Sequence, residues 1–142
     1  MRAALACLIT LSVVGAAGCA SPEVRQFRAQ LSGSGEAPAT PTHATGHAEV
    51  TLDTDSRLLS WRVAYEGLSG PVTAAQFMAP PQPGGTPVSV LAITGPLGTP
   101  IVSSAHVSDV QVGDLRAGLW SVHLITAKYP GGELAGDLEG AP

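Results

Sequence analysis

The chain has 142 residues, of which 44% are hydrophobic, 4% are aromatic and 13% are charged, against about 25% charged in an average soluble domain. Its length allows one small domain, and its 17 glycines and 12 prolines indicate many turns and exclude a helical bundle. The net charge of −4 and the absence of a Lys/Arg cluster exclude a nucleic-acid partner.

The N-terminus has the layout of a secretory signal peptide. Arg2 precedes an apolar stretch, residues 3–17, which is too short to span a bilayer comfortably and ends in small residues. Cys19 follows Gly18 directly, an order that resembles the lipobox of bacterial lipoproteins, in which the cysteine receives the lipid. The alternative is an ordinary signal peptide with Cys19 near the cleavage site.

These features predict how the chain is divided. Residues 1–18 are expected to be removed as the signal peptide, residues 19–24 to form a lipidated tether, and residues 25–142 to form one domain. Ala20 stands where an inner-membrane retention signal would place aspartate, so we expect export to the envelope and anchoring at the outer membrane. The short tether would hold the domain close to the membrane surface.

From Val24 onward, apolar and polar residues alternate, which is typical of half-buried strands. Eight short strands are predicted, at residues 27–31, 48–52, 59–65, 72–78, 88–93, 101–107, 119–126 and 133–139. Groups rich in Gly, Pro and Asp separate them, and only residues 110–117 permit one short helical turn. The pattern predicts an all-β, antiparallel sandwich or barrel.

Several runs of residues carry a resemblance to a known family. The run Phe-Arg-Ala-Gln-Leu-Ser-Gly at 27–33 is followed by Glu36 and Pro38, and the run at 126–136 contains Tyr-Pro-Gly-Gly-Glu. With the Trp-containing run at 59–70, their order and spacing resemble the CHRD domain, first named from chordin, over about residues 25–140. The resemblance implies an immunoglobulin-like β-sandwich and an extracellular binding role.

The chain departs from this family at three positions. Bacterial members usually carry a His-x-His pair and a further histidine, reminiscent of metal ligands, where this chain has Gln76, Met78 and Ile125. Together with His123, these side chains are expected to point outward, where the family's histidines could converge. The opposite, core-facing set is expected to be Phe77, Trp120, Val122 and Leu124. Met78 and His123 remain as weak candidates for cuprous copper, which thioether and imidazole ligands suit.

The other candidate residues favour structural roles. His43, His47 and His106 are expected to lie in solvent rather than to bind metal. Asp53 and Asp55 fit an Asx-type hairpin turn and lack the further oxygen ligands of a calcium loop. The two tryptophans, Trp61 and Trp120, lie on core-facing stripes, which favours packing over carbohydrate stacking.

Catalytic signals are few. Ser69 lies between Gly67 and Gly70, but a nucleophile elbow needs a following helix, and the sequence places no histidine or carboxylate beside it. Glu133 is expected to accept backbone N–H bonds in its turn and to hold the last strand in register. We therefore expect no enzymatic activity and no cofactor, and a hydrolase is a distant third hypothesis.

Two functions of different classes remain. The first is a lipid-anchored, non-catalytic binding module that offers sheet edges and the Pro/Gly-rich loop at 80–87 to an envelope protein. The alternative is a divergent copper- or metal-handling envelope protein that uses Met78 and His123. Metal titration would distinguish the two.

Overall fold

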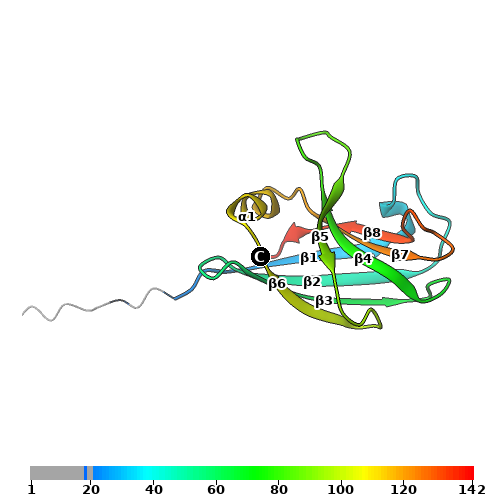
Figure 1. Ribbon diagram of the computed structural model, residues 1–142, viewed down its shortest axis with the longest axis horizontal. Coiled ribbons are helices and arrows are strands. Elements are labelled where there is room, and N and C mark those ends of the chain that lie inside the picture. Colours follow the sequence, from blue (N-terminus) through cyan, green and yellow to red (C-terminus); the bar gives the residue numbers. More distant parts are fainter. Residues whose placement is uncertain (1–17, 19–20) are drawn as a thin grey trace, which may run out of the picture.

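The computed structural model describes residue 18 and residues 21–142 (Figure 1). The predicted signal peptide and Cys19 lie outside the described residues. The strands are β1 (Val24–Ser32), β2 (Thr45–Asp53), β3 (Leu58–Glu66), β4 (Val72–Ala79), β5 (Val88–Ile93), β6 (Ile101–His106), β7 (Ser121–Thr126), β8 (Leu134–Asp137) and β9 (Glu139–Gly140). A 3₁₀ turn, η1 (Gly33–Gly35), and one helix, α1 (Asp109–Arg116), complete the fold.

All eight predicted strands form, as β1 to β8, and the short helical element predicted near residues 110–117 is α1. The two-residue strand β9 was not predicted, because two residues are too few to show an alternating pattern. The prediction of an all-β antiparallel domain is therefore confirmed.

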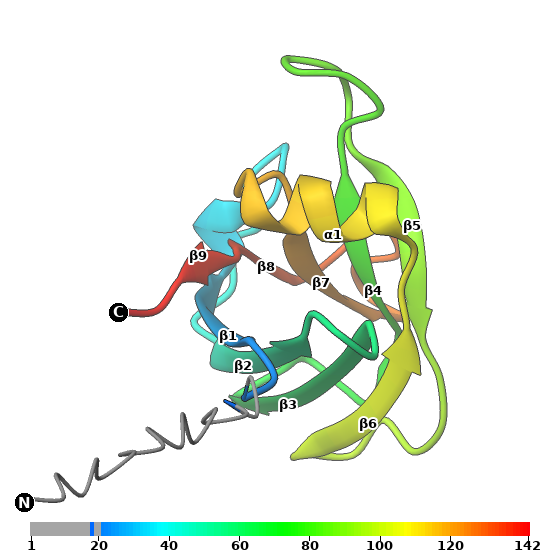
Figure 2. The same cartoon turned by 90° about the vertical axis from the view of Figure 1, so that its left-hand side faces the viewer.

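The strands belong to one antiparallel sheet in the order β5-β4-β7-β8-β1-β2-β3-β6, with β9 beside β1. The sheet curls until β5 and β6 lie on the same side of the molecule, so that it nearly closes into a barrel (Figure 2). The immunoglobulin-like sandwich is not confirmed, because a sandwich has two packed sheets and here one ladder connects every strand. The twist of long strands such as β1, β2 and β3 carries the sheet around the core.

The core fills the inside of this curled sheet. The ring of Phe77 lies between the two tryptophans, with its centroid 5.2 Å from that of Trp61 and 5.4 Å from that of Trp120. Val122 and Leu124 of β7 are fully buried beside them. The predicted inward stripe is therefore confirmed, and both tryptophans pack inside, as expected.

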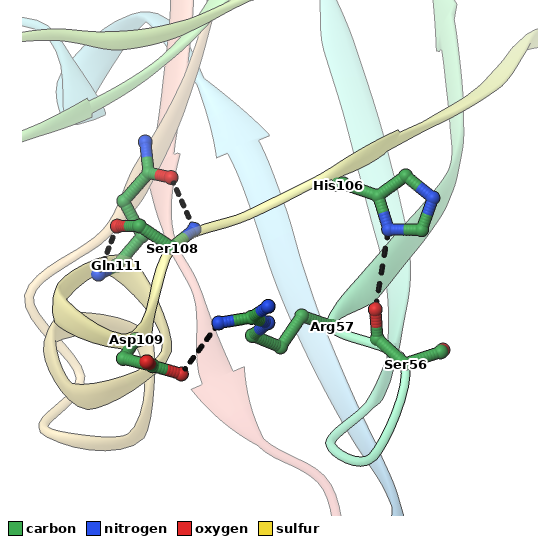
Figure 3. A network of polar contacts seen from close by, with 6 residues as sticks. All are labelled: Ser56, Arg57, His106, Ser108, Asp109 and Gln111. Atoms are coloured by element: carbon green, nitrogen blue, oxygen red, sulfur yellow. Dashed lines mark hydrogen bonds and ion pairs between the residues drawn. The ribbon is translucent and has the colours of Figure 1, made fainter.

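A polar network joins the β2–β3 turn to the start of α1 (Figure 3). Arg57, whose φ of 57° is the one positive value among non-glycine residues in the described part, donates from Nη1 to Asp109 Oδ1 at 3.1 Å. His106 Nδ1 lies 3.2 Å from the carbonyl oxygen of Ser56. These contacts fix where the chain leaves β6 and enters the helix.

Reciprocal capping begins α1. The hydroxyl of Ser108 accepts the backbone N–H of Gln111 at 3.2 Å, and the Gln111 side chain accepts the Ser108 backbone N–H at 2.9 Å. Gln111 Nε2 also donates to the carbonyl of Val90 in β5 at 3.0 Å. The helix therefore lies against the free edge of β5.

Candidate functional site

The site is built on the outer face of β7, around His123. This residue is paired with Gln76 of β4, and its side chain is 13% exposed. Its Nε2 lies 2.9 Å from the hydroxyl oxygen of Ser121, and its Nδ1 lies 3.3 Å from Oε2 of Glu36. Both ring nitrogens of His123 therefore have protein partners.

Glu36 reaches His123 from the segment between η1 and β2. It is only 8% exposed, and its Oε1 is buried without a hydrogen-bond partner. This segment packs closely against the sheet, and the lack of a side chain at Gly35 permits the contact, since a Cβ there would overlap the backbone of Ala135 in β8. Gly132 likewise leaves room for the Glu36 carboxylate, which a Cβ at Gly132 would overlap.

Glu36 was not predicted as a site residue. It contributed only to the family resemblance, because no local pattern indicates which strand a loop carboxylate covers. The one sequence feature that could have indicated Glu36 is its place in a Gly-rich turn directly after an apolar strand.

Gln76, Met78, His123 and Ile125 are half-buried, on the face opposite the core, as predicted. Gln76 Nε2 donates to Met78 Sδ at 3.5 Å. The prediction that the three family-histidine positions could converge is wrong, because Met78 pairs with Ser121 while Ile125 pairs with Ala74. These pairs are four residues apart, or about 14 Å along the strand, so the positions form a row rather than a cluster.

Met78 and His123 are diagonal neighbours across β4 and β7. Among the described residues, no group of three or more His, Cys, Asp or Glu side chains is placed to hold a metal ion. A copper site at Met78 and His123 would also have to displace one of the two partners of the imidazole.

Glu133 forms a second polar cluster at the end of the sheet. Its carboxylate, which is fully buried, accepts hydrogen bonds from the hydroxyls of Ser69 at 2.6 Å, Thr126 at 2.6 Å and Thr42 at 2.9 Å. The backbone N–H of Ser69 donates a fourth, at 3.0 Å. Burial alone would raise the pKa of Glu133, but these hydrogen bonds outweigh it and hold the pKa below its ordinary value.

This cluster corrects two predictions. A carboxylate, that of Glu133, does lie beside Ser69, although the two residues are 64 positions apart in the chain. Glu133 does accept a backbone N–H, but from the β3–β4 turn rather than from its own turn, and most of its donors are hydroxyls. Every partner of the carboxylate is a hydroxyl or a backbone amide. The cluster therefore has a structural role, in which Glu133 joins the segments that contain Thr42, Ser69 and Thr126.

The remaining polar candidates lie where they were expected. His43, His47 and His106 are exposed. Asp53 Oδ1 accepts the backbone N–H groups of Asp55 and Ser56, each at 3.0 Å, which forms the predicted Asx turn. The backbone hydrogen bond from Ser56 is the main cause that lowers the pKa of Asp53.

The sheet ends in two strands that each have one neighbour, β5 beside β4 and β6 beside β3. Val102 on β6 is 66% exposed, and Val88 at the start of β5 is 48% exposed. The loop at 80–87, which joins β4 and β5, extends away from the body of the domain (Figures 1 and 2).

Fold and sites together define an all-β domain on one curled antiparallel sheet, with a carboxylate–imidazole–hydroxyl contact on its outer face. The family model of the CHRD domain matches residues 27–138, so the chain belongs to the CHRD-domain family, as the resemblance indicated. Neither the curated proteins nor the solved structures contain a match to this chain.

Proposed function

We propose that this CHRD-domain protein is a non-catalytic binding module, anchored at the cell envelope by a lipid on Cys19, that captures an extended segment of an envelope protein along β6. The observation that carries the proposal is the open edge of this strand, which pairs only with β3. An unpaired strand edge presents a row of N–H and C=O groups to which another chain can add.

The composition of β6 suits such an addition. Its sequence, Ile-Val-Ser-Ser-Ala-His, contains no proline, lysine or acidic residue, although these are residues that usually protect an edge strand. Val102 offers an apolar contact on the outer face. The opposite edge, on β5, is less available because Gln111 of α1 already occupies the carbonyl of Val90.

The loop at 80–87 supplies a second contact region. Six of its eight residues are exposed; its four prolines stiffen the loop, and together with two glycines they disfavour regular structure. A projecting loop next to a rigid sheet is a common place for recognition. This loop and β6 would set which partner binds.

The anchor fits the start of the domain. Val24, the first residue of β1, comes five residues after Cys19, so a lipid on Cys19 would hold the sheet close to the outer membrane. None of the helices in the described residues is long and apolar enough to cross a membrane.

A photo-crosslinking amino acid placed at position 102 tests the edge. We expect position 102 to crosslink a partner in intact envelopes, and position 110 on α1, where the valine is 73% exposed, to serve as the matched control. An affinity column that carries the Val102→Lys variant should retain less of the partner than a column that carries the wild-type protein, because a charge at an edge opposes strand addition. Equal crosslinking from both positions, or capture unaffected by Val102→Lys, would reject β6 as the docking edge.

The copper-handling alternative gains no support from the contacts of His123. A copper ion binds one ring nitrogen, so it would have to displace Ser121 from Nε2 or Glu36 from Nδ1.

A further inference from the structure

Three side chains on the outer face of β7 form a continuous relay. Ser121 and His123 are two residues apart on one strand, so their side chains share a face. The Ser121 hydroxyl oxygen lies 2.9 Å from Nε2 of His123, whose Nδ1 lies 3.3 Å from Oε2 of Glu36. A hydroxyl, an imidazole and a buried carboxylate in this order are the groups that activate a serine nucleophile.

The proposed relay requires one arrangement of protons. The relay requires the tautomer of His123 that carries its proton on Nδ1, the nitrogen 3.3 Å from Glu36 Oε2, because the lone pair on Nε2 can then accept the proton of Ser121. The other acceptor for the Ser121 hydroxyl is the carbonyl of Met78, at the longer distance of 3.4 Å. Glu36 Oε1 has no hydrogen-bond partner, so in the described residues the imidazole is the one polar side chain shown in contact with this carboxylate.

All three groups of the relay are largely shielded from solvent. The Glu36 side chain is 5% exposed and that of His123 is 13% exposed, while Ser121 keeps 8% of its surface in solvent. Gln76, the cross-strand partner of His123, donates its amide to the thioether of Met78, which is a weak acceptor. Because this hydrogen bond is weak, the amide loses little if it donates instead to an oxygen that gains negative charge.

From this geometry we infer that Ser121 is a nucleophilic modification site that accepts acyl groups from activated carboxylic esters, with His123 as its base and Glu36 as a positioning residue. The Ser121 oxygen forms a bond to the carbonyl carbon while its proton passes to Nε2 of His123. The ester C–O bond then breaks, and the leaving alcohol takes the electron pair and that proton. One modification per chain requires no turnover, so the inference goes beyond the binding role and is compatible with it.

The chain contains a matched comparison pair. Ser104 and His106 of β6 have the same spacing, and both are exposed, so a reagent reaches them more easily. However, His106 Nδ1 faces the carbonyl oxygen of Ser56 rather than a carboxylate (Figure 3). Ser104 and His106 are therefore accessible to a reagent but lack the carboxylate that completes the relay.

The test treats the full-length protein, purified in detergent, with a fluorophosphonate, which reacts by the same attack and releases fluoride. Peptide mass spectrometry should find the label on Ser121 at least about tenfold above Ser104. Ser121→Ala should abolish the label and His123→Gln should lower its rate about 100-fold, while His106→Gln should leave the rate unchanged. Labelling at Ser121 no faster than at Ser104, or undiminished in a folded His123→Gln variant, would overturn the inference.

The role of Glu36 needs its own readout. Hydrogen bonding to Glu36 should place the His123 Nδ1–H proton far downfield in the NMR spectrum, and Glu36→Gln should remove that signal and slow the labelling. If Glu36→Gln does not fold, the comparison of Ser121 with Ser104 and the His123→Gln result still decide. A folded Glu36→Gln variant with the wild-type signal and labelling rate would exclude Glu36 as the positioning residue.

Discussion

Glu133 concentrates more hydrogen bonds than any other carboxylate in the described residues, and its charge should control acid stability. Its pKa in the folded state lies below that of the unfolded chain, which is about 4.3. The stabilisation is therefore present above this value and is lost as the pH falls through the folded-state pKa.

We expect Glu133→Gln to lower the free energy of unfolding by about 1–3 kcal/mol at pH 7, because the amide group faces hydroxyl donors. The difference from the wild type should shrink between pH 5 and pH 3, as measured by urea unfolding. Glu139→Gln, at an exposed position, is the control and should change little. A deficit that stays constant over this range would exclude the charge of Glu133 as its source.

The tryptophans should dominate the packing energy of individual side chains. Trp120 is 1% exposed and contacts Phe77, so Trp120→Ala should lower the free energy of unfolding by about 3–5 kcal/mol. Such a loss is large against a total stability of about 5–15 kcal/mol. Chemical unfolding measures it, with the exposed Val110→Ala as control, and iodide should quench the native fluorescence poorly. Ready quenching of the folded protein would contradict the inward placement.

The row of family-histidine positions limits how a metal site can be engineered. Gln76→His with Met78→His restores a His-x-His pair on one face of β4, so this double variant should bind Cu²⁺ or Zn²⁺ more tightly than either single variant. Adding Ile125→His should contribute little, because position 125 pairs with Ala74, at the far end of the row from position 78. Calorimetric titration with the metal measures the affinity of each variant. A large gain in affinity from the third histidine would contradict the pairing register of β4 and β7.

At the scale of elements, the hairpin of β4 and β5 should fold without its long loop. The ladder ends at the pair Ala79 and Val88, and residues 81–84 between them are exposed. Replacing residues 80–87 by Asn-Gly, a two-residue turn that suits antiparallel strands, should change the free energy of unfolding by less than about 1 kcal/mol. Thermal unfolding measures this, and a collapse in stability would show that the loop packs as part of the core.

For the whole molecule, the anchor is the decisive feature. Cys19→Ser should abolish incorporation of a labelled fatty acid and leave the protein unprocessed or free in the periplasm. Cys7→Ser is the matched control, because Cys7 lies within the predicted signal and should not affect the label. Unchanged labelling and membrane partitioning of Cys19→Ser would exclude the lipoprotein interpretation.

The sequence by itself determined the strands, their inward faces and the Asx turn at Asp53. These features repeat over two to four residues and follow from local backbone geometry, so a pattern such as the alternation in 59–65 is enough to find them. The order of motifs likewise indicated the family that the match over residues 27–138 confirmed.

Only the tertiary structure decided how the strands join and which distant polar groups meet. One continuous ladder replaced the expected sandwich because strand order depends on the curl of the entire sheet, which no local pattern encodes. The contact of Glu36 with His123, and that of Glu133 with Ser69, form for the same reason. Each joins segments far apart in the chain, and burial leaves a carboxylate to be stabilised by whichever donors the fold brings to it.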